Sequence, residues 1–218
     1  MNTHVPLTAA PMITAAIPFD DPAKGWRSAA RQLLTAHIRP EEIEWAFDAP
    51  QRETLPRSVG TKVRVTERFL ELADHVCLHA APERFDLLYR LIWRMRLDPT
   101  LMSSDDAEVA LLCQMERTVM RAAAEMRRGL RVHMTGQGTL AGWHDSRHDV
   151  LPLIQPWLVR HFSEFSVVVQ TPRRQGIVRD GVCRWLRPLA RPALPRDTGD
   201  PMWGSYLRAV HGPQALSA

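Results

Sequence analysis

The sequence predicts an α+β fold that is predominantly helical, with a small, antiparallel sheet and a C-terminal hairpin. Two observations lead to this prediction. Apolar residues recur at the spacing of a helix face over much of residues 69–126. Short segments elsewhere in the chain alternate apolar and polar residues or are rich in β-branched residues, as strands are.

The chain opens with a predicted strand, helix and second strand. Residues 11–19 form the first strand, and Asp20-Asp21-Pro22 then provides a helix start. Aspartate accepts hydrogen bonds from the first helical amides, and proline fits the first helical position. Residues 43–47 alternate as a half-buried strand does, and proline and glycine among polar residues predict a loop at 48–63.

Three helices are expected in the middle of the chain. Apolar stripes place them at residues 69–80, 82–95 and 109–126. A cap between residues 103 and 106 precedes the third helix, and Gly129 ends it, because glycine commonly follows the last helical turn.

The last third mixes strands and helices. Residues 130–134 and 139–143 form a hairpin around Gly136-Gln137-Gly138. The remaining elements are a helix at 150–162, a strand at 167–170, a hairpin of 177–179 with 182–185, and a last helix at 202–210. Asp180-Gly181 joins the second hairpin, since Asp-Gly tolerates the positive φ angles of a type I′ turn.

One domain is expected over residues 11–211, between a flexible N-terminus at 1–10 and a C-terminal tail at 212–218. Of the 218 residues 45% are hydrophobic, which suffices to bury a core and excludes a wholly disordered chain. The sequence has no apolar run of membrane-spanning length, no basic leader and no paired cysteine spacing. These features predict a cytoplasmic protein with no membrane partner.

Positive charge is concentrated in the second half of the chain. Residues 1–110 carry 13 basic and 16 acidic side chains, whereas residues 111–218 carry 15 and 8. This asymmetry favours a surface that faces a polyanion or a protein partner, without choosing between them. Of the 28 basic residues only Lys24 and Lys62 are lysine, and such an arginine excess also arises in GC-rich genomes.

Several stretches match one known family in order along the chain. They are the runs Trp26–Arg31, Pro40–Trp45 and Arg84–Arg94, Trp143 with His148, the runs Arg160–Phe162, Thr171–Pro172 and Asp180–Gly181, and Trp203 with Tyr206. The chain thereby resembles the uncharacterised domain found fused to UdgX-like uracil-DNA glycosylases. That domain also occurs alone as a DNA-metabolism protein, typically encoded beside a radical-SAM protein.

The resemblance implies an accessory protein of DNA repair or DNA metabolism. Its expected partners are DNA, bound weakly and in a salt-dependent manner, and a glycosylase-like or radical-SAM protein. The chain departs from the family after its long helix, where Ala122 and Ala124-Glu125-Met126 replace an Asp and a His-Lys-Met run. Because no glycine-rich phosphate loop or other catalytic motif is present, a non-catalytic member without a cofactor is expected.

The most polar run of the sequence is His144-Asp145-Ser146-Arg147-His148-Asp149. Two histidines four residues apart share a helix face and are able to bind a metal, but the run resembles no known zinc signature, so no metal is expected. The alternative is a helix start with Ser146 as its N-cap. If the protein is an enzyme, His148, His144 and Asp145 are the candidate catalytic residues, with Trp143 as the wall of their pocket.

Candidate nucleic-acid contacts are five arginines in two regions. They are Arg90 and Arg94 on the helix at 82–95, and Arg173, Arg174 and Arg179 on a loop and the second hairpin. Arg90 and Arg94 lie one helical turn apart and repel each other unless an anion lies between them. A basic loop beside a hairpin suits salt-sensitive, sequence-independent binding, and the alternative is an ordinary solvated surface.

Two other functions stay open. One is an enzyme with a His/Asp pocket around Trp143–His148, which a buried polar pocket containing His148 favours. The other is a protein-interaction module that has kept the scaffold and lost ancestral chemistry.

Overall fold

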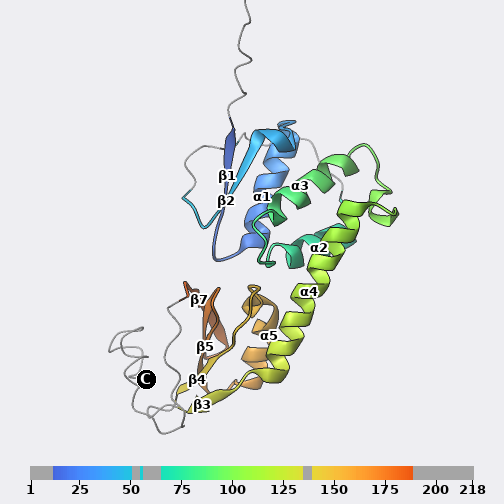
Figure 1. The fold of residues 1–218 in the computed structure, drawn as a ribbon. Helices are drawn as coiled ribbons and strands as arrows, with labels where there is room; N and C mark the ends of the chain where they lie inside the picture. Colours follow the sequence, from blue (N-terminus) through green and yellow to red (C-terminus); the bar gives the residue numbers. More distant parts are fainter. Residues whose placement is uncertain (1–11, 51–54, 56–64, 135–138, 189–218) are drawn as a thin grey trace, which may run out of the picture. The chain divides into compact units, whose positions relative to one another are not determined.

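The computed structural model describes residues 12–50, 55, 65–134 and 139–188 (Figure 1). Within these ranges the chain forms five α-helices and two small sheets, which confirms the predicted α+β, mostly helical fold. The chain divides into two compact units, unit 1 (Met1–Cys77 and Ala81–Met115) and unit 2 (Leu78–Ala80 and Glu116–Ala218). The single domain expected over residues 11–211 stays a prediction.

Some expected features lie outside the described residues. These are the flexible N-terminus at 1–10, most of the loop at 48–63, the turn at 136–138, the helix at 202–210 and the tail at 212–218. No helix in the described part of the chain combines the length and the apolar character that crossing a membrane requires.

Unit 1 begins with two parallel strands joined by a helix. The elements are β1 (Ile13–Ile17), α1 (Pro22–Thr35) and β2 (Ile43–Phe47). Asp21 accepts a hydrogen bond from the Lys24 amide and Pro22 begins α1, as predicted. The prediction of antiparallel pairing is wrong for these strands, because a helical crossover returns the chain in the same direction.

The rest of unit 1 is helical. Its elements are η1 (Pro40–Glu42), α2 (Glu67–Val76), α3 (Arg84–Met95), η2 (Leu101–Ser103) and the first part of α4 (Ala107–Gly129). Buried aromatic side chains fill the core, and two of them form hydrogen bonds there: Trp26 Nε1 donates to the Phe85 carbonyl at 3.1 Å, and the Tyr89 hydroxyl donates to the Ile38 carbonyl at 2.8 Å.

Unit 2 contains a five-stranded sheet in the order β3-β4-β5-β6-β7. The strands are β3 (Val132–Met134), β4 (Thr139–Trp143), β5 (Ser166–Gln170), β6 (Gln175–Arg179) and β7 (Val182–Leu186). Both predicted hairpins are present, β3 with β4 and β6 with β7, and Asp180 and Gly181 join the second with φ angles of 50° and 74°. The sheet is nevertheless mixed rather than antiparallel, since β4 and β5 are parallel and connected through α5 (Leu151–His161).

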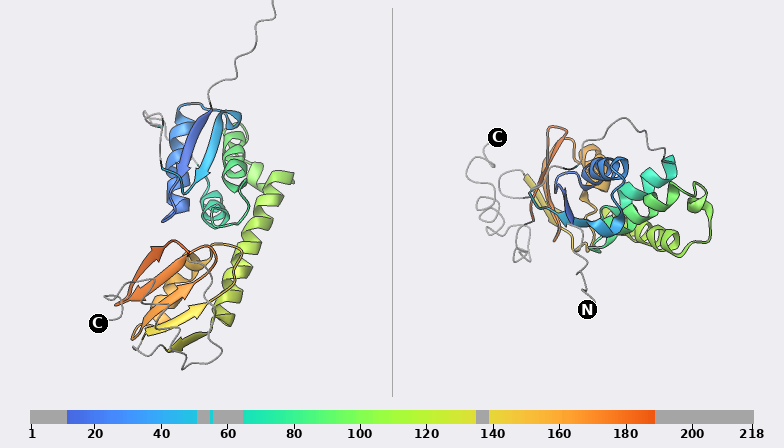
Figure 2. Two further views of the ribbon diagram at one scale, coloured as in Figure 1. Left: turned by 60° about the vertical axis from the view of Figure 1, so that its left-hand side comes forward. Right: turned by 90° about the horizontal axis from the view of Figure 1, so that it is seen from above.

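One face of this sheet is covered by helices (Figure 2). Ile154 and Leu158 of α5 and Val119 and Met126 of α4 share a buried apolar cluster with β5 and β6. The parallel pairing of β4 and β5 has a direct consequence for the site. It places Trp143 opposite Gln170, so the segments that follow these two strands start from neighbouring positions.

Candidate functional site

Three short segments of unit 2 come together next to the carboxyl ends of β4 and β5. They are residues 78–80, 144–150 and 171–174, and we call them the loop cluster. The Asp149 amide donates to the Leu78 carbonyl at 3.0 Å, and the Ala80 amide donates to Nδ1 of His148 at 3.1 Å. Nε of Arg173 donates to the Arg147 carbonyl at 2.9 Å. The cluster is thus cross-linked by hydrogen bonds between residues far apart in sequence.

The polar run at 144–149 is a loop and not a helix start. Helix α5 begins at Leu151, with Pro152 in its first turn, and no side chain caps it. The buried Ser146 hydroxyl instead donates to the His148 carbonyl at 2.8 Å, which also accepts from the Val150 amide at 3.0 Å. The predicted N-cap at Ser146 is therefore wrong, because the helix begins only at Leu151 and the Ser146 hydroxyl takes part in the loop before it.

The imidazole of His148 is held in one neutral form. A backbone N–H only donates, so Nδ1 of His148 is an acceptor and the proton of the neutral ring is on Nε2. Burial lowers the pKa of His148, and the charges of Arg147 and Arg173 lower it further. The ring lies against His79 with 4.4 Å between centroids. In this form His148 has a hydrogen-bond donor at Nε2, and its catalytic role stays a prediction.

His144 has different surroundings. Its Nδ1 is buried and has no hydrogen-bond partner in the described part of the chain, and its Nε2 is 3.9 Å from where a Cβ on Gly129 would lie. Burial lowers the pKa of His144, whereas Asp145 and Glu125 raise it. The charges that act on His148 come from arginines, whereas those that act on His144 come from carboxylates. No group of three or more potential metal ligands occurs among the described residues.

Arg174 belongs to the interior of the loop cluster. Its side chain is 0% exposed and forms a bidentate ion pair with Asp149, with Nε 2.9 Å from Oδ1 and the terminal nitrogen 2.7 Å from Oδ2. Its guanidinium lies 5.4 Å from the ring centre of Trp185. The hydroxyl of Thr171 accepts from the amides of Arg173 and Arg174, at 3.2 Å and 3.0 Å. These contacts fix the backbone of the loop after β5.

Arg147 and Arg173 are the exposed arginines of the loop cluster. Among the described residues, the ion pairs of unit 2 include Arg174 and Arg179 but neither Arg147 nor Arg173. Arg179 lies on β6, and its Nε is 3.6 Å from the carboxylate of the neighbouring Asp180. Trp143 is half-buried at the end of β4, and its role as a pocket wall stays a prediction.

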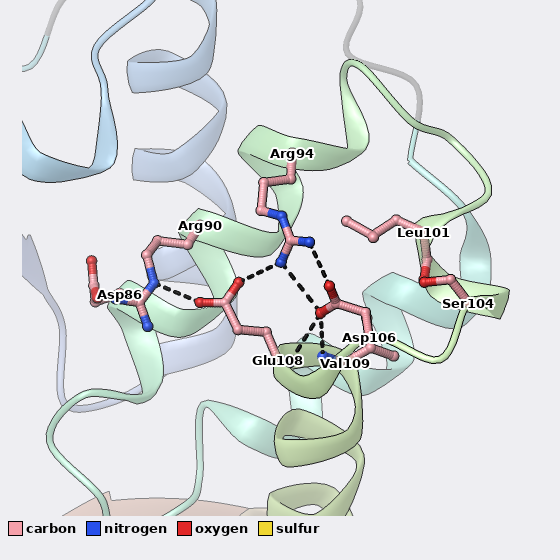
Figure 3. Close-up of polar contacts among 8 residues, drawn as sticks. All are labelled: Asp86, Arg90, Arg94, Leu101, Ser104, Asp106, Glu108 and Val109. Carbon is pink, nitrogen blue, oxygen red and sulfur yellow. Dashed lines mark hydrogen bonds and ion pairs between the residues drawn. The ribbon is translucent and has the colours of Figure 1, made fainter.

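Arg90 and Arg94 of unit 1 have anionic partners within the protein (Figure 3). Glu108 lies between them: its carboxylate forms an ion pair with Nε of Arg90 at 2.8 Å and accepts a hydrogen bond from Arg94, also at 2.8 Å. Asp86 is 3.3 Å from Arg90, and Asp106 pairs with Arg94. The anion that the sequence requires between these two arginines is therefore supplied by Glu108, and their contact with nucleic acid stays a prediction.

The sequence reasoning missed several members of the loop cluster. His79 lies far from the polar run, and the bond from Ala80 to His148 joins positions 68 residues apart. Arg147 stood out only as part of the run, and Thr171 only as part of a family stretch. The recurrence of Thr171–Pro172 in that family was the signal that pointed to this loop.

Comparison with known proteins gives one match. The model of a domain of unknown function, DUF4130, matches residues 82–216, which is more than half of the chain. No curated protein and no solved structure matches the chain significantly. The match confirms that the chain has an uncharacterised family domain, while the link to glycosylases or radical-SAM proteins stays a prediction. The chain belongs to the DUF4130 family of domains of unknown function.

Proposed function

We propose that this protein is a non-catalytic accessory protein of DNA repair or DNA metabolism, which contacts the nucleic-acid backbone through the loop cluster. Its partner in this proposal is a glycosylase-like or radical-SAM protein, and any base flipping and chemistry belong to that partner. One observation carries the DNA contact. Arg147 and Arg173 are both exposed, Nε of Arg173 donates to the backbone carbonyl of Arg147, and both charges lower the pKa of the His148 imidazole.

Other arginines of the protein are less suited to this contact. The charges of Arg90 and Arg94 are balanced by three carboxylates, and Arg174 is buried against Asp149. A guanidinium that already has a bidentate carboxylate partner gains little from a phosphate, because the carboxylate must first be displaced. Arg147 and Arg173 have no such carboxylate within the described residues.

The sequence supports the same surface. The loop cluster lies mostly in the second half of the chain, where basic residues outnumber acidic ones by 15 to 8. Phosphate contacts made by arginines on loops position a protein on nucleic acid without reading base sequence. We therefore expect sequence-independent binding that weakens as salt concentration rises.

The hydrogen bonding of His148 gives less support to the alternative function, an enzyme with a His/Asp pocket. A general base needs an unprotonated nitrogen facing its substrate, whereas His148 uses its unprotonated Nδ1 for the Ala80 amide. A neutral imidazole of this kind acts as a donor toward an oxygen that carries negative charge. The hydrogen bonding of His148 thus favours anion binding over proton abstraction.

The proposal is tested by DNA binding of the full chain at several salt concentrations. We expect the variant carrying both Arg147→Gln and Arg173→Gln to bind more weakly at low salt. The slope of log affinity against log salt should be less steep for the variant, by about 0.9 for each phosphate of duplex DNA that it no longer neutralises. Fluorescence anisotropy with a labelled duplex and a labelled single strand measures both quantities.

Arg31→Gln is the control, because Arg31 is an exposed arginine of α1 in unit 1 and its substitution removes one positive charge, as each of the two test substitutions does. It should leave the affinity and the slope close to those of the wild type. Absence of binding to either DNA at low salt, or equal weakening in the control, would refute the proposed contact.

A further inference from the structure

The positive charges of Arg147 and Arg173 are not the only groups of the loop cluster that can bind an anion. The cluster also presents the Nε2–H of His148, and no hydrogen bond among the described residues uses this donor. We propose that the loop cluster recognises a phosphate monoester, which in the proposed function is the terminal phosphate of a nucleic-acid strand. The source of the phosphate rests on the proposed function, whereas the site itself is argued from charge, donors and rigidity.

The charge of the site fits a monoester better than an internal phosphodiester. A monoester carries about 1.5 to 2 negative charges at neutral pH and three unbridged oxygens. An internal phosphodiester carries a single charge, which one guanidinium neutralises. Arg147 and Arg173 lie close enough to His148 for both charges to affect it, and Nε of Arg173 is bonded to the Arg147 backbone. The two positive charges near His148 therefore correspond to the charge of a terminal phosphate.

His148 adds a neutral donor where a third cation would be repelled. The groups facing its ring are His79, whose ring centre is 4.4 Å away in a tilted arrangement, and the charges of Arg147 and Arg173. Asp149, the next residue, is bound to Arg174, and the charge of Asp145 acts on His144 instead. Protonating Nδ1 would break the bond from the Ala80 amide. The ring thus donates from Nε2 without taking up a second proton.

The framework of the site is rigid before any ligand binds. The buried pair of Asp149 and Arg174 and the Thr171 hydroxyl fix the segment that carries Arg173. Ser146 and Val150 both donate to the carbonyl of His148, and Asp149 is bonded to Leu78. Binding therefore orders little more than two arginine side chains, which lowers the entropic cost of association.

The experiment compares three single-stranded oligonucleotides of one sequence, with a 5′-phosphate, with a 3′-phosphate, or with hydroxyls at both ends. We expect the wild type to bind at least one phosphorylated strand about tenfold more tightly than the unphosphorylated strand, as for one or two charge-assisted hydrogen bonds. In His148→Asn the Asn oxygen is able to accept from the Ala80 amide, but the Nε2 donor is removed. This variant should lose most of the preference, and the exposed Arg173→Gln variant should do the same.

His161→Asn is the matched control, since His161 lies at the end of α5 and stacks on Trp157 outside the loop cluster. It should keep the preference for the phosphorylated strand. A further readout is the tautomer of His148 in ¹H–¹⁵N spectra, which should show a protonated Nε2 and an unprotonated Nδ1 at neutral pH. A protonated Nδ1 would overturn the donor assignment.

The outcomes separate this inference from the proposed function. Equal, salt-sensitive binding of all three strands would leave the proposed function standing and overturn the terminal-phosphate site. Absence of binding to any strand would remove the proposed function, and inorganic phosphate would then be titrated against the His148 signals. A saturable shift that His148→Asn abolishes would support the site for a phosphate monoester of another source, and no shift at millimolar phosphate would overturn it.

Discussion

At the scale of single residues, the buried pair of Asp149 and Arg174 decides how the loop cluster is held. Both side chains leave water on folding, with exposures of 12% and 0%. Taking charges out of water is costly, and the cost is offset only when the pairing geometry is good and other hydrogen bonds are satisfied. The pair meets this condition through three short nitrogen–oxygen contacts.

Removing one partner of this pair should be strongly destabilising. Asp149→Asn leaves the Arg174 guanidinium buried without a countercharge, and we expect a loss of about 3–5 kcal/mol in the free energy of unfolding. Arg179→Gln is the contrast, because that ion pair is exposed, and it should cost about 0–1 kcal/mol. Urea denaturation followed by circular dichroism measures both. A loss below that of Arg179→Gln would show that the Asp149–Arg174 pair is not holding the loops.

At the scale of elements, the start of α4 is anchored to α3 by charged side chains (Figure 3). Asp106 accepts hydrogen bonds from the amides of Glu108 and Val109, as a capping residue does, and it also pairs with Arg94 of α3. The hydrogen bond from Arg94 is the main cause that holds the pKa of Asp106 below its ordinary value, followed by the bond from the Val109 amide. The predicted cap between residues 103 and 106 is thereby confirmed at Asp106.

The stability that Asp106 contributes to the folded state should decrease as the pH is lowered. A carboxyl whose pKa is lowered by folding stabilises the folded state above its unfolded pKa of about 3.9, and the effect is lost as pH falls through the folded value. Asp106→Asn should therefore lower the urea midpoint at about pH 7, and its difference from the wild type should shrink as pH falls below about 3.9 toward the lowered pKa of folded Asp106, where the carboxyl becomes protonated.

Asp86→Asn is the matched comparison for this pH dependence. Burial raises the pKa of Asp86, which outweighs the lowering by Arg90, so folding disfavours its charged form. This substitution should cost less at neutral pH than Asp106→Asn. A pH-independent difference between wild type and Asp106→Asn would contradict a contribution from the ionised carboxylate.

At the scale of the whole molecule, α4 is a single helix whose residues belong to both compact units. Residues Ala107–Met115 are part of unit 1 and the helix continues to Gly129 in unit 2. Each unit has its own buried apolar cluster, and a continuous helix propagates order along its length. The prediction of one domain over residues 11–211 can therefore be tested by asking whether the two units unfold together.

We expect the two units to unfold in one transition, because fraying of α4 in one unit removes packed residues from the other. Urea unfolding followed by hydrogen exchange and mass spectrometry resolves peptides of each unit. Midpoints and slopes should coincide for β1–α3 peptides and for β4–β7 peptides. Two separated transitions would instead show two independent domains.

The sequence was sufficient where a structure depends on neighbouring residues. The capped start of α1 at Asp21-Pro22, the type I′ turn at Asp180-Gly181 and the amphipathic helices were predictable, because caps, turns and periodicity act over a few positions. The helix start at Ser146 was not, since the serine hydroxyl can either accept from a helix amide or donate to a nearby carbonyl, and here it donates to the His148 carbonyl within the loop.

The sequence by itself therefore determined most of the described helices and strands, their order and the α+β class, and it located the polar run at 144–149. Only the tertiary structure decided that β1 and β2, and β4 and β5, pair in parallel, because pairing depends on how a crossover packs and not on strand sequence. It also decided which charges are balanced. Asp86, Glu108 and Asp106 balance the charges of Arg90 and Arg94, and Asp149 balances that of Arg174. Arg147 and Arg173 both lie close enough to His148 for their charges to act on it. Residue spacing does not specify these partners, since they are set by contacts between segments that only the fold brings within hydrogen-bonding distance.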